Sequence, residues 1–154
     1  MSSQLRHIEN KRRLYRCLAD LAGSPLKELA NRLEAIYHKD AHWRGSHPLN
    51  ELDGIDAIAA RVWQPLLHAF PDLERRDVIV VAGHHNEQDQ VAMLGHYCGR
   101  FCKNWLGIPA TGRPVFLRYA EIHSVTDGKI SGSTVLIDLL DLMRQVGLWP
   151  SLTD

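Results

Sequence analysis

The stretch from residue 115 to residue 137 constrains the fold of this chain more than any other. Val115 to Val125 and Ile130 to Ile137 are two apolar runs rich in β-branched residues, and the pair Asp127-Gly128 lies between them. An Asp-Gly pair between two such runs is typical of the tight turn of a β-hairpin. We therefore expect two antiparallel strands here.

A second hairpin is predicted just before this one. Residues 78–82 are apolar and β-branched, residues 84–90 are polar, and residues 91–102 return to a strand-like pattern. A curved sheet needs places where its strands can bend, and glycines inside strands supply them. Three glycines are suited to this role: Gly95, Gly99 and Gly132.

The first half of the chain has helical periodicity instead. Apolar residues recur every three to four positions in three segments: residues 5–21, 26–36 and 55–70. Ser24 is suited to cap the second helix and Pro25 to begin it. Asp53 can cap the third helix, which Pro65 should kink. A short helix is expected at about residues 139–146, so the order of elements predicts an α+β fold.

Composition limits the size and setting of the protein. A chain of 154 residues, 45% of them hydrophobic, is long enough for one domain over residues 1–154. Eighteen basic residues balance eighteen acidic ones, so we expect neither nucleic acid nor a membrane as partner. Three cysteines and a polar amino-terminal segment favour a cytoplasmic protein.

Several motifs follow one another in a recognisable order. They are Asp40-Ala41-His42-Trp43, His47-Pro48-Leu49, residues 54–58, Ala69-Phe70-Pro71-Asp72-Leu73, residues 106–113, Asp127-Gly128-Lys129-Ile130 and residues 137–143. Over about residues 30–147 the chain resembles the SnoaL-like polyketide cyclases of the NTF2-like superfamily. The resemblance implies a cone in which about three helices wrap a curved antiparallel sheet around an apolar cavity, with a short carboxy-terminal helix and frequent dimerisation.

The same resemblance implies a chemistry. The best-understood members close a polyketide ring by an intramolecular aldol reaction without a cofactor, whereas others are isomerases, hydrolases or dehydratases, or only bind. In the cyclase-like pattern the acid/base carboxylate lies at the position of Asp138. Relatives often carry a Glu-His-Trp-like trio after the Gly-Lys-Ile motif, where this chain has Gly132, Ser133 and Thr134. This difference favours another substrate, or a loss of catalysis.

Asp138 has two open interpretations. Strand alternation places Asp138 on one face with Ile130, Gly132, Thr134 and Leu136, and a carboxylate inside an apolar cavity can serve as a general acid or base. Alternatively, Asp138 caps the helix that follows it. Which role applies depends on whether its side chain points into an enclosed pocket.

His123 is the second candidate for proton transfer. It shares a strand face with Leu117, Tyr119, Glu121 and Val125, from which an imidazole can bond Asp138 or a substrate oxygen across the hairpin. Counting from Asp127-Gly128 does not put His123 level with Asp138, so that contact depends on the curvature of the sheet. The other interpretation is an ordinary histidine on a solvated face. The resemblance places further residues around the cavity as substrate contacts: Trp43, His47, Trp63, Met93, His96, Trp105, Tyr119 and Glu121.

Two of these residues have simpler explanations as well. Trp63 lies on the apolar stripe of the third helix, where core packing is the alternative role. His96, Cys98 and Cys102 alternate onto one strand face, but they diverge too far to hold a tetrahedral zinc ion, so no metal is expected.

Two functions follow from these patterns. The first is a cofactor-free cyclase or isomerase that uses Asp138 and His123 on a hydrophobic, polyketide-like carbonyl compound. The second is a non-catalytic module that binds a hydrophobic small molecule or a partner protein. An antiparallel sheet with apolar residues on both faces also predicts a homodimer.

Overall fold

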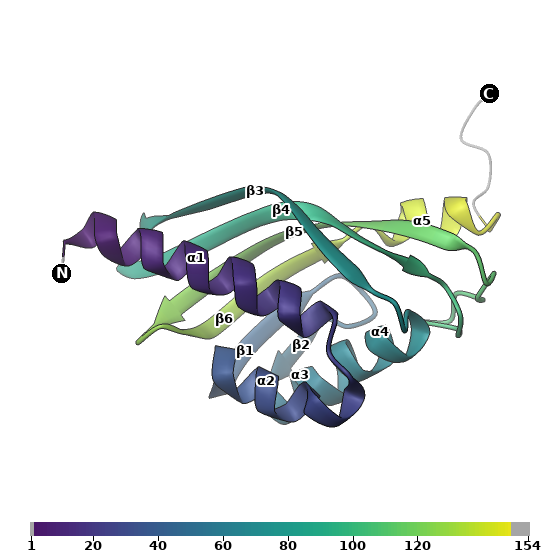
Figure 1. The fold of residues 1–154 in the computed structure, drawn as a ribbon, viewed down its shortest axis with the longest axis horizontal. Helices are drawn as coiled ribbons and strands as arrows, with labels where there is room; N and C mark the ends of the chain where they lie inside the picture. The colour runs from purple at the N-terminus through teal and green to yellow at the C-terminus, as the bar shows by residue number, and fades with distance from the viewer. Residues whose placement is uncertain (1, 149–154) are drawn as a thin grey trace.

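The computed structural model describes residues 2–148, and Figure 1 shows their arrangement. In chain order the elements are α1 (Ser3–Ala22), η1 (Leu26–Glu28), α2 (Leu29–Ile36), β1 (Tyr37–Gly45), β2 (Glu51–Asp53), α3 (Ile55–Ile58), η2 (Ala59–Trp63), α4 (Gln64–Ala69), β3 (Glu74–His85), β4 (Gln88–Arg100), β5 (Pro114–Thr126), β6 (Lys129–Ile137) and α5 (Leu139–Gln145). The predicted α+β class is confirmed. The four helices α1 to α4 lie along one face of a curved sheet (Figure 1).

The sheet has six strands in the order β2-β1-β6-β5-β4-β3. Both predicted hairpins are present, and β1 and β6 form one parallel pair in an otherwise antiparallel sheet. Asp127 and Gly128 have φ values of 48° and 73°, as their hairpin turn requires. The β3–β4 turn is tighter than expected, because Asn86 and Glu87, with φ of 49° and 61°, are the two residues between the strands.

A β-bulge in β6 changes which side chains face the interior. Val125 pairs with Ile130 but Ser124 pairs with Gly132, so Ser131 is an extra residue on β6. One extra residue moves every later side chain to the opposite face of the sheet. The predicted grouping of Ile130 with Asp138 on one face is therefore wrong: Ile130 is buried, and after the bulge the buried side chains are Ser133, Val135 and Ile137.

Two helix starts also differ from the sequence prediction. Ser24 does not cap the second helix, because its hydroxyl donates to the carbonyl oxygen of Asp20 and so closes α1. The residue before α3 is Gly54, with φ of +84°, and the carboxylate of Asp53 instead lies 2.7 Å from Nδ1 of His42. In both cases the side chain expected to cap the helix interacts instead with another nearby polar group.

The third predicted helix is interrupted just before Pro65. It changes from α-helix in α3 to π-helix in η2 and back to α-helix in α4, which has Pro65 in its first turn. Proline has no N–H to donate to the preceding turn, and π-turns are a common way to absorb such a break. This wider turn carries Trp63, whose side chain is buried under the sheet.

The helices and the sheet enclose one hydrophobic core. The opposite face of the sheet is exposed and strongly apolar, with Ile79, Val81, Leu94, Phe116, Ile122 and Leu136 all about half exposed. A shallow depression of about 270 Å³ lies on that outer face. None of the helices among residues 2–148 has the length and hydropathy needed to cross a membrane.

Candidate functional site

A buried cluster of charged side chains begins on β3. The strand opens with Glu74-Arg75-Arg76-Asp77, and alternation sends Arg75 and Asp77 inward while Glu74 and Arg76 remain in solvent. The side chains of Arg75 and Asp77 are 0% and 1% exposed. Burying a charge is costly unless it is paired, so these two residues need partners inside the core.

Arg75 finds those partners on three strands. It donates to both oxygens of Asp77, through Nε at 3.2 and 3.1 Å and through Nη2 at 2.9 Å. Its Nη1 and Nη2 also donate to the two oxygens of Glu121 on β5, at 3.1 and 2.7 Å, and Nη1 donates to the Tyr97 hydroxyl on β4 at 3.1 Å. The guanidinium has five N–H groups. These bonds use all of them, so Arg75 holds its neighbours in place and has no donor left for a ligand.

Glu121 continues the network toward β6 through His123. Nε2 of His123 lies 3.0 Å from Oε2 of Glu121, and Nδ1 lies 2.7 Å from the Ser133 hydroxyl. Glu121 and His123 both lie on the inner face of β5, and His123 pairs directly with Ser133 across the hairpin. The result is a buried line of carboxylate, imidazole and hydroxyl. An ionised Glu121 requires the hydrogen on Nε2, which leaves Nδ1 to accept the Ser133 proton.

The electrostatics of the cluster keep its carboxylate ionised. Burial alone raises the pKa of Glu121, but the charge of Arg75 and the hydrogen bond from His123 outweigh burial and lower the pKa to about 2. Burial raises the pKa of Tyr37 to about 12 and also raises the pKa values of Tyr97 and Tyr119. At neutral pH the site therefore contains an ionised Glu121 next to neutral phenols.

Three hydrogen-bond donors face the interior without an acceptor. The hydroxyl of Tyr119 is occupied, because it donates to Oδ1 of Asp77 at 2.6 Å. The hydroxyl of Tyr97 accepts from Arg75, and within the described part of the chain its own proton has no acceptor. The indole Nε1 atoms of Trp63 and Trp105 are buried and likewise lack a partner among residues 2–148. Buried donors without partners are rare in proteins and point to a place for another molecule.

The two ends of the network approach the surface at different places. Asp77 borders a depression of about 410 Å³ between α1 and β3, whose other lining residues include Lys11 and Tyr15. Tyr37, next to the other end, borders a depression of about 430 Å³ together with Lys39 and Lys129.

Most of the predicted site residues are buried. The buried ones are Trp43, Trp63, Met93, Trp105, Tyr119, Glu121 and His123. The alternative interpretation of His123 as a solvated histidine is wrong, since it is 1% exposed. His47 is exposed in the loop after β1, and His96 faces outward, where its ring lies edge-on to Phe116 at 5.7 Å. The expected substrate contacts at His47 and His96 are thus not brought to the interior.

Asp138 also lies outside the interior cluster. Its Oδ1 accepts a hydrogen bond of 2.9 Å from the backbone N–H of Asp141, which makes it the cap of α5. Its other oxygen pairs with the exposed Arg118 at 2.9 Å. The bulge at Ser131 explains the change, because it turns Asp138 away from the face that carries His123. The geometry therefore matches the cap interpretation.

Arg75, Asp77 and Tyr97 were missed in the sequence. The polar run Glu74-Arg75-Arg76-Asp77 resembles the end of a loop, and charged residues are not expected to face a core. A usable signal was present, since Arg75 and Asp77 are two apart and so lie on the same strand face. His123 and Glu121, by contrast, were placed correctly on one face by the same period-two argument.

A family model described as SnoaL-like polyketide cyclase matches residues 13–146. No match was found among curated proteins.

Solved structures share the fold at low sequence identity. A proposed SnoaL-like polyketide cyclase from Jannaschia sp. CCS1 has 18% identity and a TM-score of 0.76, over 94% of this chain and 95% of that one. AclR from Streptomyces galilaeus, a proposed hydroxylase, has 20% identity and a TM-score of 0.76, over 96% and 87% of the two chains. IdmH from Streptomyces antibioticus, a proposed polyketide cyclase, has 21% identity and a TM-score of 0.71, over 92% and 99%. These similarities confirm the predicted NTF2-like fold.

Proposed function

Because the chain belongs to the SnoaL-like polyketide cyclase family, we propose that it is a cofactor-free cyclase or isomerase that moves a proton on a hydrophobic carbonyl compound. One observation carries the proposal: the buried line Glu121–His123–Ser133, which continues the charged cluster of Arg75 and Asp77 into the core. A fold is stabilised just as well by apolar residues at such positions. Groups of this kind gather where proton transfer is needed.

His123 is the acid/base group in this proposal. The Ser133 hydroxyl lies 2.7 Å from Nδ1 of His123. When a substrate takes the place of that hydroxyl, Nδ1 removes a proton from the carbon next to the substrate carbonyl. The resulting enolate carbon bonds to a second carbonyl carbon, and the same proton returns to the alkoxide that forms. Atoms and electrons balance without an oxidant or reductant, because the product is an isomer of the substrate.

Glu121 and Arg75 act through His123. Glu121 fixes which imidazole nitrogen carries hydrogen and stabilises the positive charge that forms when Nδ1 is protonated. Two carboxylates, Asp77 and Glu121, flank the single guanidinium of Arg75, and Glu121 is the one that contacts His123. Arg75 is a positioning residue, because its five donors are all engaged.

The unpaired donors supply the remaining requirement of this reaction. The negative oxygen of an enolate needs hydrogen bonds that are already in place. The hydroxyl of Tyr97 and the indole N–H groups of Trp63 and Trp105 are such donors in the same interior. Apolar side chains around them, including Trp43 and Met93, suit a hydrophobic substrate.

A binding module is the second candidate, and one observation favours it. Gly132, Ser133 and Thr134 stand where relatives often carry a Glu-His-Trp-like trio, so this strand lacks the acid/base side chains of that trio. On this alternative the protein binds a hydrophobic molecule without changing it.

Matched substitutions at His123 and Asp138 test the proposal. A panel of polyketide-like compounds with two carbonyl groups is screened by tryptophan fluorescence for binding and by chromatography for an isomeric product. His123→Asn keeps a polar atom near the Nδ1 position but cannot accept a proton, so turnover should fall at least about a hundredfold while ligand affinity changes little. Asp138→Asn keeps the α5 cap and should leave turnover unchanged.

The opposite pattern would refute the assignment. If His123→Asn remains active and Asp138→Asn does not, Asp138 is the acid/base residue despite its position. Binding of a compound without any product, in the native protein and both variants, would support the binding module instead.

We also propose that two copies associate through the outer face of the sheet. That face presents Ile79, Leu94, Ile122 and Leu136 as one exposed apolar surface. A surface of this kind is unusual for a monomer and is best covered by an identical sheet.

A further inference from the structure

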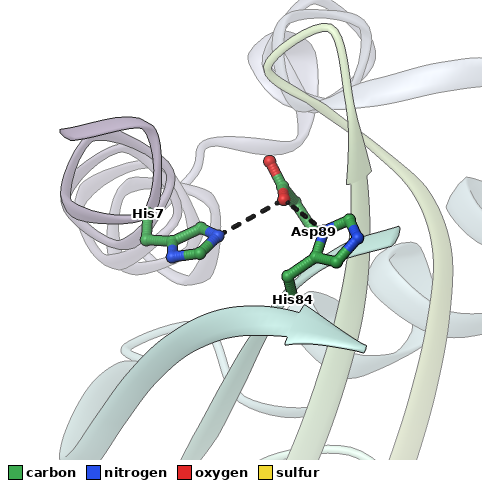
Figure 2. Close-up of side chains that lie close together, drawn as sticks. All are labelled: His7, His84 and Asp89. Atoms are coloured by element: carbon green, nitrogen blue, oxygen red, sulfur yellow. Dashed lines mark hydrogen bonds and ion pairs between the residues drawn. The ribbon is translucent and has the colours of Figure 1, made fainter. Parts of the chain in front are cut away.

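A second polar cluster lies away from the interior network, at the far end of the β3–β4 hairpin. It consists of His7 from α1, His84 from β3 and Asp89 from β4 (Figure 2). One nitrogen from each histidine and one oxygen of Asp89 all lie within 4.8 Å of one another. Among residues 2–148 this is the one group of potential metal ligands that meets this criterion.

The local structure explains why the three side chains converge. His84 and Asp89 are direct partners across the hairpin, so their side chains project from the same face of the sheet. His7 lies one turn before Asn10, at the start of the helix stripe that packs onto the sheet. Figure 2 shows both imidazole rings directed at the same carboxylate.

The distances suit a shared ion. Oδ1 of Asp89 lies 2.9 Å from Nδ1 of His84 and 3.4 Å from Nε2 of His7. Ligands bound tetrahedrally to zinc at about 2.0–2.2 Å are separated from one another by roughly 3.3–3.6 Å. The His7–Asp89 distance lies in that range, and His84 has to move back by a few tenths of an ångström to share the ion. Nε2 of His7 is itself buried and makes no hydrogen bond within the described chain. That nitrogen thus faces the carboxylate at 3.4 Å without a hydrogen bond.

We propose that His7, His84 and Asp89 form a binding site for a divalent transition metal, with zinc the best match. Two imidazoles and one carboxylate are ligands that zinc accepts, with a further position left for water. Magnesium and calcium prefer sites made wholly of oxygen atoms, so two histidines disfavour them. The ion would join the amino-terminal turn of α1 to the β3–β4 hairpin, two elements far apart in the sequence.

Arg6 is the main competitor for the carboxylate. It pairs with Asp89 through Nε to Oδ2 and through Nη2 to Oδ1 at 3.1 Å. Asn10 also lies 3.5 Å from Oδ2. With an ion on Oδ1, Arg6 and Asn10 can keep Oδ2 and orient the carboxylate from behind.

Titration of the metal-free protein with Zn²⁺ tests the site. The full chain is stripped with a chelator and titrated in a calorimeter, and its thermal unfolding is followed with and without Zn²⁺. We expect saturable binding of one ion per chain and a higher unfolding temperature. His84→Ala, at an exposed position where folding is not at risk, should weaken binding at least about tenfold. His85→Ala, the neighbouring exposed histidine, is the control and should bind like the native protein.

Arg6→Gln makes the test sharper. Removing the guanidinium charge next to Asp89 should tighten Zn²⁺ binding if the ion occupies Oδ1. Absence of saturable binding in the native protein would overturn the proposal. So would equal affinity in His84→Ala and His85→Ala, or weaker binding in Arg6→Gln.

Discussion

Replacing Glu121 by glutamine removes the charge that connects Arg75 to His123 while leaving the side chain almost the same size. The pKa of Glu121 falls from an ordinary 4.5 to about 2 in the folded protein. Each pKa unit corresponds to about 1.4 kcal/mol, so the ionised form contributes roughly 3 kcal/mol to the free energy of unfolding at pH 7. Breaking one partner of a buried ion pair costs a similar amount, about 3–5 kcal/mol. We expect Glu121→Gln to lose about 3 kcal/mol.

The effect should depend on pH in a defined direction. Because the pKa of Glu121 is lower in the folded protein than in the unfolded chain, its contribution is complete above about pH 5 and is lost as the pH falls toward 2. Urea unfolding at pH 7 and pH 3 should therefore show a smaller difference between the native protein and Glu121→Gln at the lower pH. Carboxylates outside this network contribute equally in both proteins and cancel in this difference.

Glu74 provides the matched control. It also pairs with an arginine, Arg76, at 3.0 Å, but its side chain is 64% exposed. Exposed ion pairs contribute about 0–1 kcal/mol, so Glu74→Gln should be nearly neutral at both pH values. If Glu121→Gln is as stable as Glu74→Gln, or if its deficit is the same at pH 7 and pH 3, then the buried ion pair does not stabilise the fold as argued.

Three further predictions concern other parts of the molecule. A Cβ atom added at Gly95 would lie 2.6 Å from the Tyr119 hydroxyl and closer still to the Arg76 carbonyl oxygen. Gly95→Ala should therefore lower the free energy of unfolding in urea by about 1–3 kcal/mol and alter the near-ultraviolet circular dichroism. Unchanged values of both would contradict this close approach. Leu136→Lys on the outer face should convert a dimer to a monomer in sedimentation velocity, and a native protein that is already monomeric at micromolar concentration would refute the dimer. Asp138→Ala should cost about 1 kcal/mol through loss of the α5 cap whereas Asp138→Asn should be neutral, and equal stability of the two variants would argue against capping.

The parts of the fold that depend on local pattern were predictable from the sequence. Asp127-Gly128 indicated its hairpin, because few other residue pairs readily adopt positive φ at both positions. The faces of β5 followed from simple alternation, so Glu121 and His123 were correctly grouped. These inferences need only neighbouring residues.

The parts that depend on distant contacts were not predictable in the same way. The bulge at Ser131 turns Asp138 outward. Neither the apolar pattern nor the turn residues of this hairpin predict the bulge. The burial of Arg75 depends on Glu121, 46 residues away, and a single strand sequence cannot show that such a partner exists. The same bulge places Ser133 opposite His123 and so makes it part of the site.

The pairing of Arg75 with Glu121 also bears on which strand alignment the chain selects as it folds. Residues 78–81 of β3 read Val-Ile-Val-Val, four similar side chains that pack almost equally well if the strand slides along β4. A slide by one residue turns Arg75 to solvent and leaves Glu121 alone in the core, and a slide by two moves Arg75 about 7 Å along the sheet, out of reach. The ion pair thus penalises misaligned strands that the apolar contacts alone would tolerate.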